Sequence, residues 1–114
     1  MLIRKEDMPL KKAQMRGGNG EIIQQIVVPA EQMIHARMFN RLVIKSGCSI
    51  GFHEHKEEVE YYYILQGEGV VTEKECKFTA KPGDVVITGW GASHSIANEG
   101  KDDLILLAVI STEN

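Results

Sequence analysis

The chain alternates between short apolar segments and clusters of turn-forming residues. The apolar segments are rich in Val, Ile, Tyr and Thr, and the breaks between them carry sequences such as SG, GEG, KPGD and NEGKDD. This pattern is typical of the strands of an all-β sandwich or barrel. The predicted strand segments are 21–28, 37–45, 49–55, 59–67, 69–75, 76–80, 84–89, 93–99 and 103–110.

The N-terminal part of the chain differs from the rest. Residues 1–20 are mostly polar and end in RGGNG, which favours a loosely held N-terminal arm closed by a turn. The chain of 114 residues fits one domain. We therefore expect an arm at 1–20 and a single β-barrel domain at 21–114.

One internal segment, 29–38, departs from the strand pattern. It opens with Pro29 and has Met33, Ile34 and Arg37 at helical spacing, so we predict a short helix or an ordered lid. His35 lies within it, and a surface or loop position is the simpler interpretation of this histidine.

Composition narrows the class of protein. Apolar residues make up 43% and charged residues 25% of the chain, which is ordinary for a globular domain. The net charge of -3 gives no electrostatic reason to expect a nucleic-acid partner. No apolar run is long enough to span a bilayer, and no secretory signal is evident, so we expect a cytoplasmic protein. Cys48 and Cys76 are then expected to be free thiols.

The side chains that could bind a metal or a ligand are concentrated in the stretch GFHEHKEEVEYYYILQG, residues 51–67. Strand alternation places His53 and His55 on one face with Gly51, and Ile50 and Phe52 on the other face. Two imidazoles one residue apart would therefore point the same way.

Two further strands supply matching side chains. Glu60, Tyr62 and Ile64 share a face in the segment that follows, and His94 shares a face with Ile96 further on. Neighbouring strands could then direct three imidazoles and one carboxylate to a common point. Such a mixed nitrogen and oxygen set suits one divalent transition metal, and it leaves coordination positions open for a ligand.

The same residues carry a resemblance to a known family, the cupins. The first cupin motif is filled by Gly47, His53, His55, Glu60 and Gly67, at the family's spacing and within 47–67. The resemblance implies a double-stranded β-helix, also called a jelly-roll barrel, with those histidines and Glu60 as metal ligands.

The second motif lies within 83–98 and reads Gly83, DVVIT, Gly89, Trp90, Gly91, AS, His94, SIA, Asn98. It makes His94 the fourth ligand. Gly89 stands where the family usually has proline, a residue that fixes a turn and binds no metal. A barrel mouth without metal is the alternative to a complete metal site.

The spacing of the first motif also indicates which glutamates do not belong to the metal site. Glu57 and Glu58 follow His55 too closely for the motif, so we interpret the KEE turn as a solvated loop. Arg37 and Arg41 are the basic residues of the barrel strands that could pair with an anionic ligand, as guanidinium does with carboxylate. A surface charge is the alternative for each.

The alternation of side chains along each strand indicates which residues line the candidate pocket. Tyr62, Ile64 and Ile96 are expected to face inward, and we add Arg41 as a possible lining residue. The other tyrosines of the YYY run are expected to face outward, in sheet packing or a subunit interface.

The sequence looks most like the small single-domain cupins that are grouped with oxalate decarboxylases. That resemblance implies manganese as the metal, with iron, nickel or zinc as alternatives, and a small organic acid as the ligand. It favours a decarboxylase-like enzyme. The alternatives are a module that binds a small molecule without turnover, and a cupin dioxygenase or sugar isomerase. A homodimer is expected, with segment 21–28 adding to the partner's sheet.

Overall fold

The computed structural model describes all 114 residues, and its regular elements are strands and two short 3-10 helices. The elements, in chain order, are η1 (Lys5–Asp7), β1 (Leu10–Ala13), β2 (Ile22–Ile26), η2 (Ala30–Gln32), β3 (Ala36–Ile44), β4 (Ser49–Glu54), β5 (Glu58–Gln66), β6 (Gly69–Glu73), β7 (Lys77–Ala80), β8 (Val85–Gly89), β9 (Ser93–Ala97) and β10 (Leu104–Thr112).

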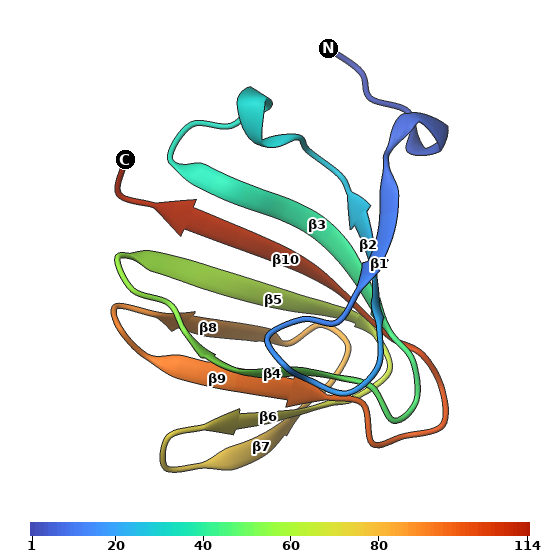
Figure 1. Ribbon diagram of the computed structural model, residues 1–114, viewed down its shortest axis with the longest axis vertical. Helices are drawn as coiled ribbons and strands as arrows, with labels where there is room; N and C mark the ends of the chain where they lie inside the picture. Colours follow the sequence, from blue (N-terminus) through green and yellow to red (C-terminus); the bar gives the residue numbers. More distant parts are fainter.

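The strands form two antiparallel sheets. The larger has the order β1-β2-β3-β10-β5-β8 and the smaller the order β4-β9-β6-β7, so most neighbours in a sheet are distant in sequence. Figure 1 shows them as two layers. This is the all-β double-stranded β-helix that the sequence predicts. No helix is long and apolar enough to cross a membrane.

The core lies between the layers and takes one side-chain face from each. The larger sheet contributes Leu42, Ile64 and Leu106, and the smaller sheet contributes Val71 and Ile96. All five are almost fully buried, and each such side chain stabilises the fold by about 1.5 to 3 kcal/mol. The metal motifs are therefore carried by two sheets held rigidly against each other.

The expected helix at 29–38 is a single 3-10 turn. It spans Ala30–Gln32, follows Pro29 and ends before Ala36, where β3 starts. The helical spacing of apolar residues is overridden because the second part of the segment pairs with β10. His35 is exposed, at the expected loop position, with a left-handed φ of 55°.

The N-terminal residues contribute to the larger sheet. Within 1–20, strand β1 pairs antiparallel with β2, from Leu10 opposite Gln25 to Ala13 opposite Ile22. Strand β2 is therefore enclosed between β1 and β3, and its two hydrogen-bonding edges are both used. The expectation that 21–28 adds to a partner's sheet is wrong for this reason.

Candidate metal centre

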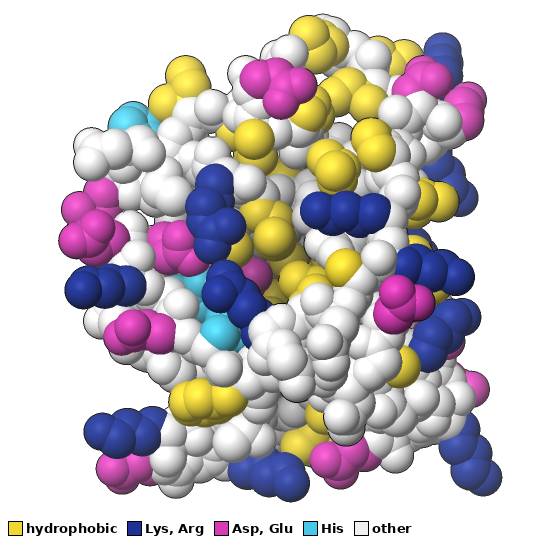
Figure 2. All heavy atoms as spheres, in the orientation of Figure 1, with side chains coloured by type: hydrophobic (Ala, Val, Ile, Leu, Met, Phe, Trp, Pro, Cys, Tyr) yellow, Lys and Arg dark blue, Asp and Glu magenta, His cyan; other side chains and the backbone are white.

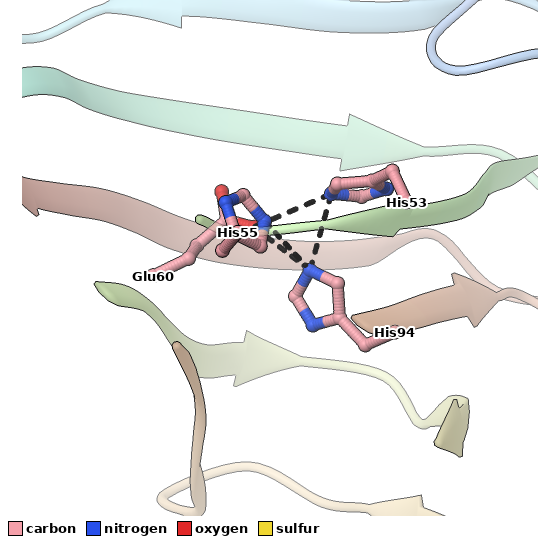
Figure 3. A group of neighbouring side chains, drawn as sticks. All are labelled: His53, His55, Glu60 and His94. Carbon is pink, nitrogen blue, oxygen red and sulfur yellow. Dashed lines mark hydrogen bonds and ion pairs between the residues drawn. The ribbon is translucent and has the colours of Figure 1, made fainter. Parts of the chain in front are cut away.

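Four side chains from both sheets converge inside the molecule. His53 lies on β4, His55 follows that strand, His94 lies on β9, and Glu60 comes from β5 in the larger sheet. Their candidate ligand atoms all lie within 4.8 Å of one another (Figure 3). The structure thus brings together all four residues that the two sequence motifs indicate.

The distances between the ligand atoms match those around a metal ion. His94 Nε2 lies 3.1 Å from His55 Nε2, 3.2 Å from His53 Nε2 and 2.9 Å from Glu60 Oε1. Two ligands at right angles around an ion, with bonds of about 2.1 Å, would be about 3.0 Å apart. The side chains need little movement to hold an ion.

The hydrogen bonds of the distal ring nitrogens support the same conclusion. His53 Nδ1 lies 2.6 Å from the Gly51 carbonyl oxygen, and His55 Nδ1 lies 2.5 Å from Glu58 Oε2. Both neighbours only accept, so Nδ1 donates in each ring, and Nε2 is the atom that faces the centre. Three ring nitrogens and a carboxylate oxygen directed at one point can share protons or hold a cation, and this set of ligand atoms fits a divalent metal.

A β-bulge in β4 corrects the predicted alternation. Ile50 pairs with Ile96 and His53 pairs with His94, so three residues of β4 span the length of two on β9. The sequence places Ile50 on the face opposite the histidines, yet it is buried in the core. The extra residue lets Ile50 and His53 face the same interior.

Glu58 was interpreted from the sequence as part of a solvated turn, and the structure corrects this. It is the first residue of β5, and its carboxylate accepts hydrogen bonds from Arg37 Nε and Nη2, each at 2.8 Å. The same carboxylate accepts the proton of His55 Nδ1. Arg37 and Glu58 therefore fix the orientation of His55, a candidate metal ligand, as residues that hydrogen-bond to metal ligands do in many metal sites.

The charges of this group shift several pKa values. The hydrogen bonds from Arg37 lower the pKa of Glu58 to about 2. Burial acts to raise the pKa of Glu60, but the hydrogen bonds from the three histidines outweigh it and hold that pKa well below its usual range. Both carboxylates are ionised at neutral pH.

The histidines shift in opposite directions. Burial lowers the pKa of His94. It also acts to lower the pKa of His55, but hydrogen bonds to Glu60 and Glu58 more than compensate and raise that pKa above its usual value. His94 Nδ1 is buried without a hydrogen-bond partner, so His94 makes its polar contacts through Nε2 alone.

Tyr62 forms one wall of the site. Its ring stacks on His94, with centroids 5.0 Å apart and planes 10° from parallel. Burial raises the pKa of its phenol well above the usual value, and the charge of Glu60 adds to this, so Tyr62 is neutral. Ile64 and Ile96 are buried in the same hydrophobic core cluster as Tyr62.

Arg41, expected as a lining residue, points away from the site. Its neighbours on β3, Asn40 and Leu42, face the interior, and Arg41 pairs in register with Leu107 on the outer face of the larger sheet. Strand alternation could not decide this from the sequence because nothing there fixed which face of β3 is buried.

These features define a β-barrel with a candidate metal site, and comparison with known proteins gives its family. Residues 40–110 match the model of the cupin domain, and the chain belongs to the cupin family. It is 43% identical over 112 residues to the oxalate-binding protein of Thermotoga maritima, covering 96% of this chain and 93% of that protein.

Solved structures agree with the family assignment. The crystal structure of a predicted oxalate decarboxylase from Thermotoga maritima matches with a TM-score of 0.92 and 41% identity, covering 98% of this chain and 99% of that chain. A putative sugar phosphate isomerase from Acidithiobacillus ferrooxidans matches with a TM-score of 0.72 and 27% identity, over 80% of this chain and 59% of that chain. The same fold thus occurs in proteins with different descriptions.

Proposed function

We propose that this protein binds a small carboxylic acid, such as oxalate, at a divalent metal held by His53, His55, Glu60 and His94. The observation that carries the proposal is the convergence of three imidazole nitrogens and one carboxylate oxygen inside the barrel. The 43% identity to a protein described as oxalate-binding supports the class of ligand. Manganese is the proposed metal because of the resemblance to oxalate decarboxylases, and the carboxylate of Glu60 is a ligand that suits it.

The chain's own residues each contribute to binding. The four ligands supply one negative charge, so a divalent ion leaves the site with a net positive charge that favours an anion. When bound, the metal supplies a Lewis acid or redox centre with positions for the acid. Tyr62 and the hydrophobic core beneath it close the inner side of the site, so the acid would enter from the opposite side.

Whether the acid is turned over depends on a group that can exchange a proton with it. Glu58 is the second carboxylate beside the histidines, and its oxygens are engaged by Arg37 and His55. This arrangement favours binding without decarboxylation. A decarboxylase-like enzyme, expected from the resemblance, is the second candidate function.

The test is calorimetric titration of oxalate into manganese-loaded protein, with His53→Ala as control, followed by NMR of the same mixture. Saturable binding that His53→Ala abolishes supports the proposal. Formate formed together with carbon dioxide would establish the enzyme instead. Failure of oxalate and other small carboxylic acids to bind would contradict the proposal.

We also propose a homodimer formed through the outer face of the larger sheet. Tyr63 is 46%, Val85 53% and Ile87 49% exposed, and cross-strand pairing joins Tyr63 to Val85 and Leu107. A continuous apolar patch of this kind on a sheet face is typical of an interface between subunits.

A further inference from the structure

Two buried side-chain atoms of the molecule lack a hydrogen-bond partner, Oγ1 of Thr88 and Nδ1 of His94. Buried polar side-chain atoms in folded proteins are nearly always hydrogen-bonded, so each exception needs a physical reason. His94 is one of the four candidate metal ligands, and Thr88 lies on the strand beside another of them, Glu60. The side-chain hydrogen bonding of the interior is therefore incomplete around the metal centre.

Strand pairing places Thr88 next to Glu60. The two residues lie directly opposite each other where β8 pairs antiparallel with β5. Opposite residues of such a pair point to the same face of the sheet, and their Cβ atoms lie about 4.5 to 5.5 Å apart. Thr88 is 2% and Glu60 4% exposed, so this face is the interior one. The Thr88 hydroxyl thus lies within reach of the Glu60 carboxylate.

Strand β8 has a polar residue at an inward position and apolar residues on its outer face. Val86 and Thr88 face the interior, while Val85 and Ile87 are about half exposed. Valine has nearly the same shape as threonine, and at position 88 it would avoid the free-energy cost of a buried hydroxyl without a partner. Packing alone therefore does not account for Thr88.

Solvent can approach the metal centre but does not reach the Thr88 hydroxyl. Figure 2 shows a hollow in which histidine side chains are visible. Oγ1 of Thr88 is buried, so water from this opening does not satisfy it. Its partner has to come from the chain. Among the inward-facing residues of β5 and β8, the carboxylate of Glu60 is the strongest hydrogen-bond acceptor.

Glu60 has one carboxylate oxygen left for a further donor. Its contacts with Nε2 of His55 and of His94, at 2.8 and 2.9 Å, both use Oε1. Oε1 is therefore the oxygen that would bind an ion together with these rings, and Oε2 is the one that a second partner can hold. Carboxylates that bind a metal are commonly oriented by such hydrogen bonds.

We propose that Thr88 is a positioning residue of the metal centre, whose hydroxyl donates a hydrogen bond to Glu60 Oε2 when a divalent ion is bound. The inference rests on the proposed metal site and adds to it a residue that does not bind the metal itself. The carboxylate has to turn toward Thr88 for this bond, because Oγ1 has no partner in this structure. Thr88 then holds Glu60 in the orientation that directs Oε1 at the ion.

The test compares Thr88→Val with the wild-type protein by calorimetric titration of Mn²⁺ and by urea unfolding in EDTA. Valine removes the hydroxyl and keeps the shape, so manganese affinity is expected to fall roughly 10-fold. The metal-free variant should unfold at a urea concentration no lower than wild type, because it no longer buries a hydroxyl without a partner. Thr79→Val is the matched control, since Thr79 is exposed on β7 and its replacement should change neither quantity.

Thr88→Ser separates this role from a packing role. Serine keeps the hydroxyl but leaves a gap in place of the methyl group, so this variant should unfold at a lower urea concentration and bind manganese nearly as wild type does. Wild-type manganese affinity in Thr88→Val would overturn the role of Thr88. Equal losses of affinity in Thr88→Val and Thr88→Ser would overturn it in favour of packing.

Failure of the proposed function would give a different result. Absence of manganese binding by the wild-type protein would overturn both the inference and the proposed metal site. Binding of manganese without binding of oxalate would overturn the acid-binding function alone, because the Thr88 variants are compared through the metal.

Discussion

His55 and Glu58 are joined by a hydrogen bond of 2.5 Å between Nδ1 and Oε2, three residues apart at the turn between the two sheets. Arg37 donates two hydrogen bonds to the same carboxylate. Glu58 can therefore neither rotate nor lose its charge easily. His55 is held as the tautomer that offers Nε2 to a metal ion.

Replacing Glu58 with Gln should weaken metal binding. The amide keeps the shape but loses the charge that orients His55 and increases its basicity, so manganese affinity is expected to fall roughly 10- to 100-fold. Calorimetric titration with Mn²⁺ measures it. Glu57→Gln is the control, because Glu57 is an exposed neighbour in the same turn. Equal affinities of Glu58→Gln and wild-type protein would contradict the prediction.

Removing a candidate metal ligand should abolish the increase in unfolding free energy that bound metal gives. Wild-type protein at a free metal concentration of 100 times its Kd gains about 2.7 kcal/mol in unfolding free energy. His53→Ala or Glu60→Gln should show little of this gain. Thermal melts with Mn²⁺ and with EDTA measure it, and His35→Ala, which removes an exposed histidine, should behave as wild type. A metal-dependent rise in Tm that persists in His53→Ala would exclude this site.

Spacing along the chain predicted which four residues come together, because they lie on strands, or directly after one, whose ends are fixed by turns. His53, His55, Glu60 and His94 are all found in one group. Ile50 could not be placed correctly, because a bulge changes the side-chain alternation and nothing in its neighbours signals one. The bulge is recognisable only from its pairing with β9.

The residues that hydrogen-bond to the candidate ligands were harder to predict, because their contacts depend on how the strands pair. Glu58 lies in a charged turn, where exposure is the usual outcome, and its neighbour Arg37 is 21 residues away in sequence. Only the pairing of β3, β10 and β5 brings them together. The one local signal is that Glu58 stands three residues after His55, within reach of its ring.

The stability of metal-free protein should depend on pH through the pair of His55 and Glu58. The lowered pKa of Glu58, about 2, contributes stability that is present above the ordinary value of 4.5 and is lost as pH falls toward 2. The raised pKa of His55 contributes stability that is present below 6.5 and is lost as pH rises through its folded value. The pair therefore stabilises most between these limits.

Urea unfolding in EDTA can measure this window. The difference in unfolding free energy between wild-type protein and Glu58→Gln is expected to be largest at pH 5 to 6, smaller at pH 3, and smaller again once pH has risen above the folded pKa of His55. Glu57→Gln should show no such maximum. Arg37 alone would give the fall on the acid side, so a difference that does not fall as pH rises above 6.5 would mean that His55 and Glu58 are not coupled.

Gly51→Ala should disturb the bulge and the metal site together. The added Cβ would lie 2.0 Å from the Arg16 carbonyl oxygen, so either the loop of residues 14–20, which is hydrogen-bonded to β4, or the strand itself must shift. We expect a loss of about 1 to 3 kcal/mol in unfolding free energy. Manganese affinity should fall as well, since Gly51 accepts the proton of His53 Nδ1.

The control for this change is Gly100→Ala, where the nearest atom would be 3.5 Å away and no left-handed φ is required. Chemical denaturation and calorimetric titration report the two effects separately. If Gly51→Ala has wild-type stability and metal affinity, the loop is not fixed against the bulge as described.

Charge placed on the outer face of the larger sheet should separate the proposed dimer. Ile87 is 49% exposed and pairs with Tyr61, on the edge strand β8 that carries part of the apolar patch. In Ile87→Lys, two copies of the new ammonium group would be buried near each other across a two-fold interface, which is unfavourable without a partner charge. Light scattering after size-exclusion chromatography should show a monomer, while Phe78→Lys, on the edge strand β7 of the smaller sheet, should stay dimeric. A wild-type monomer at micromolar concentration would remove the dimer, and a dimeric Ile87→Lys would place its interface elsewhere.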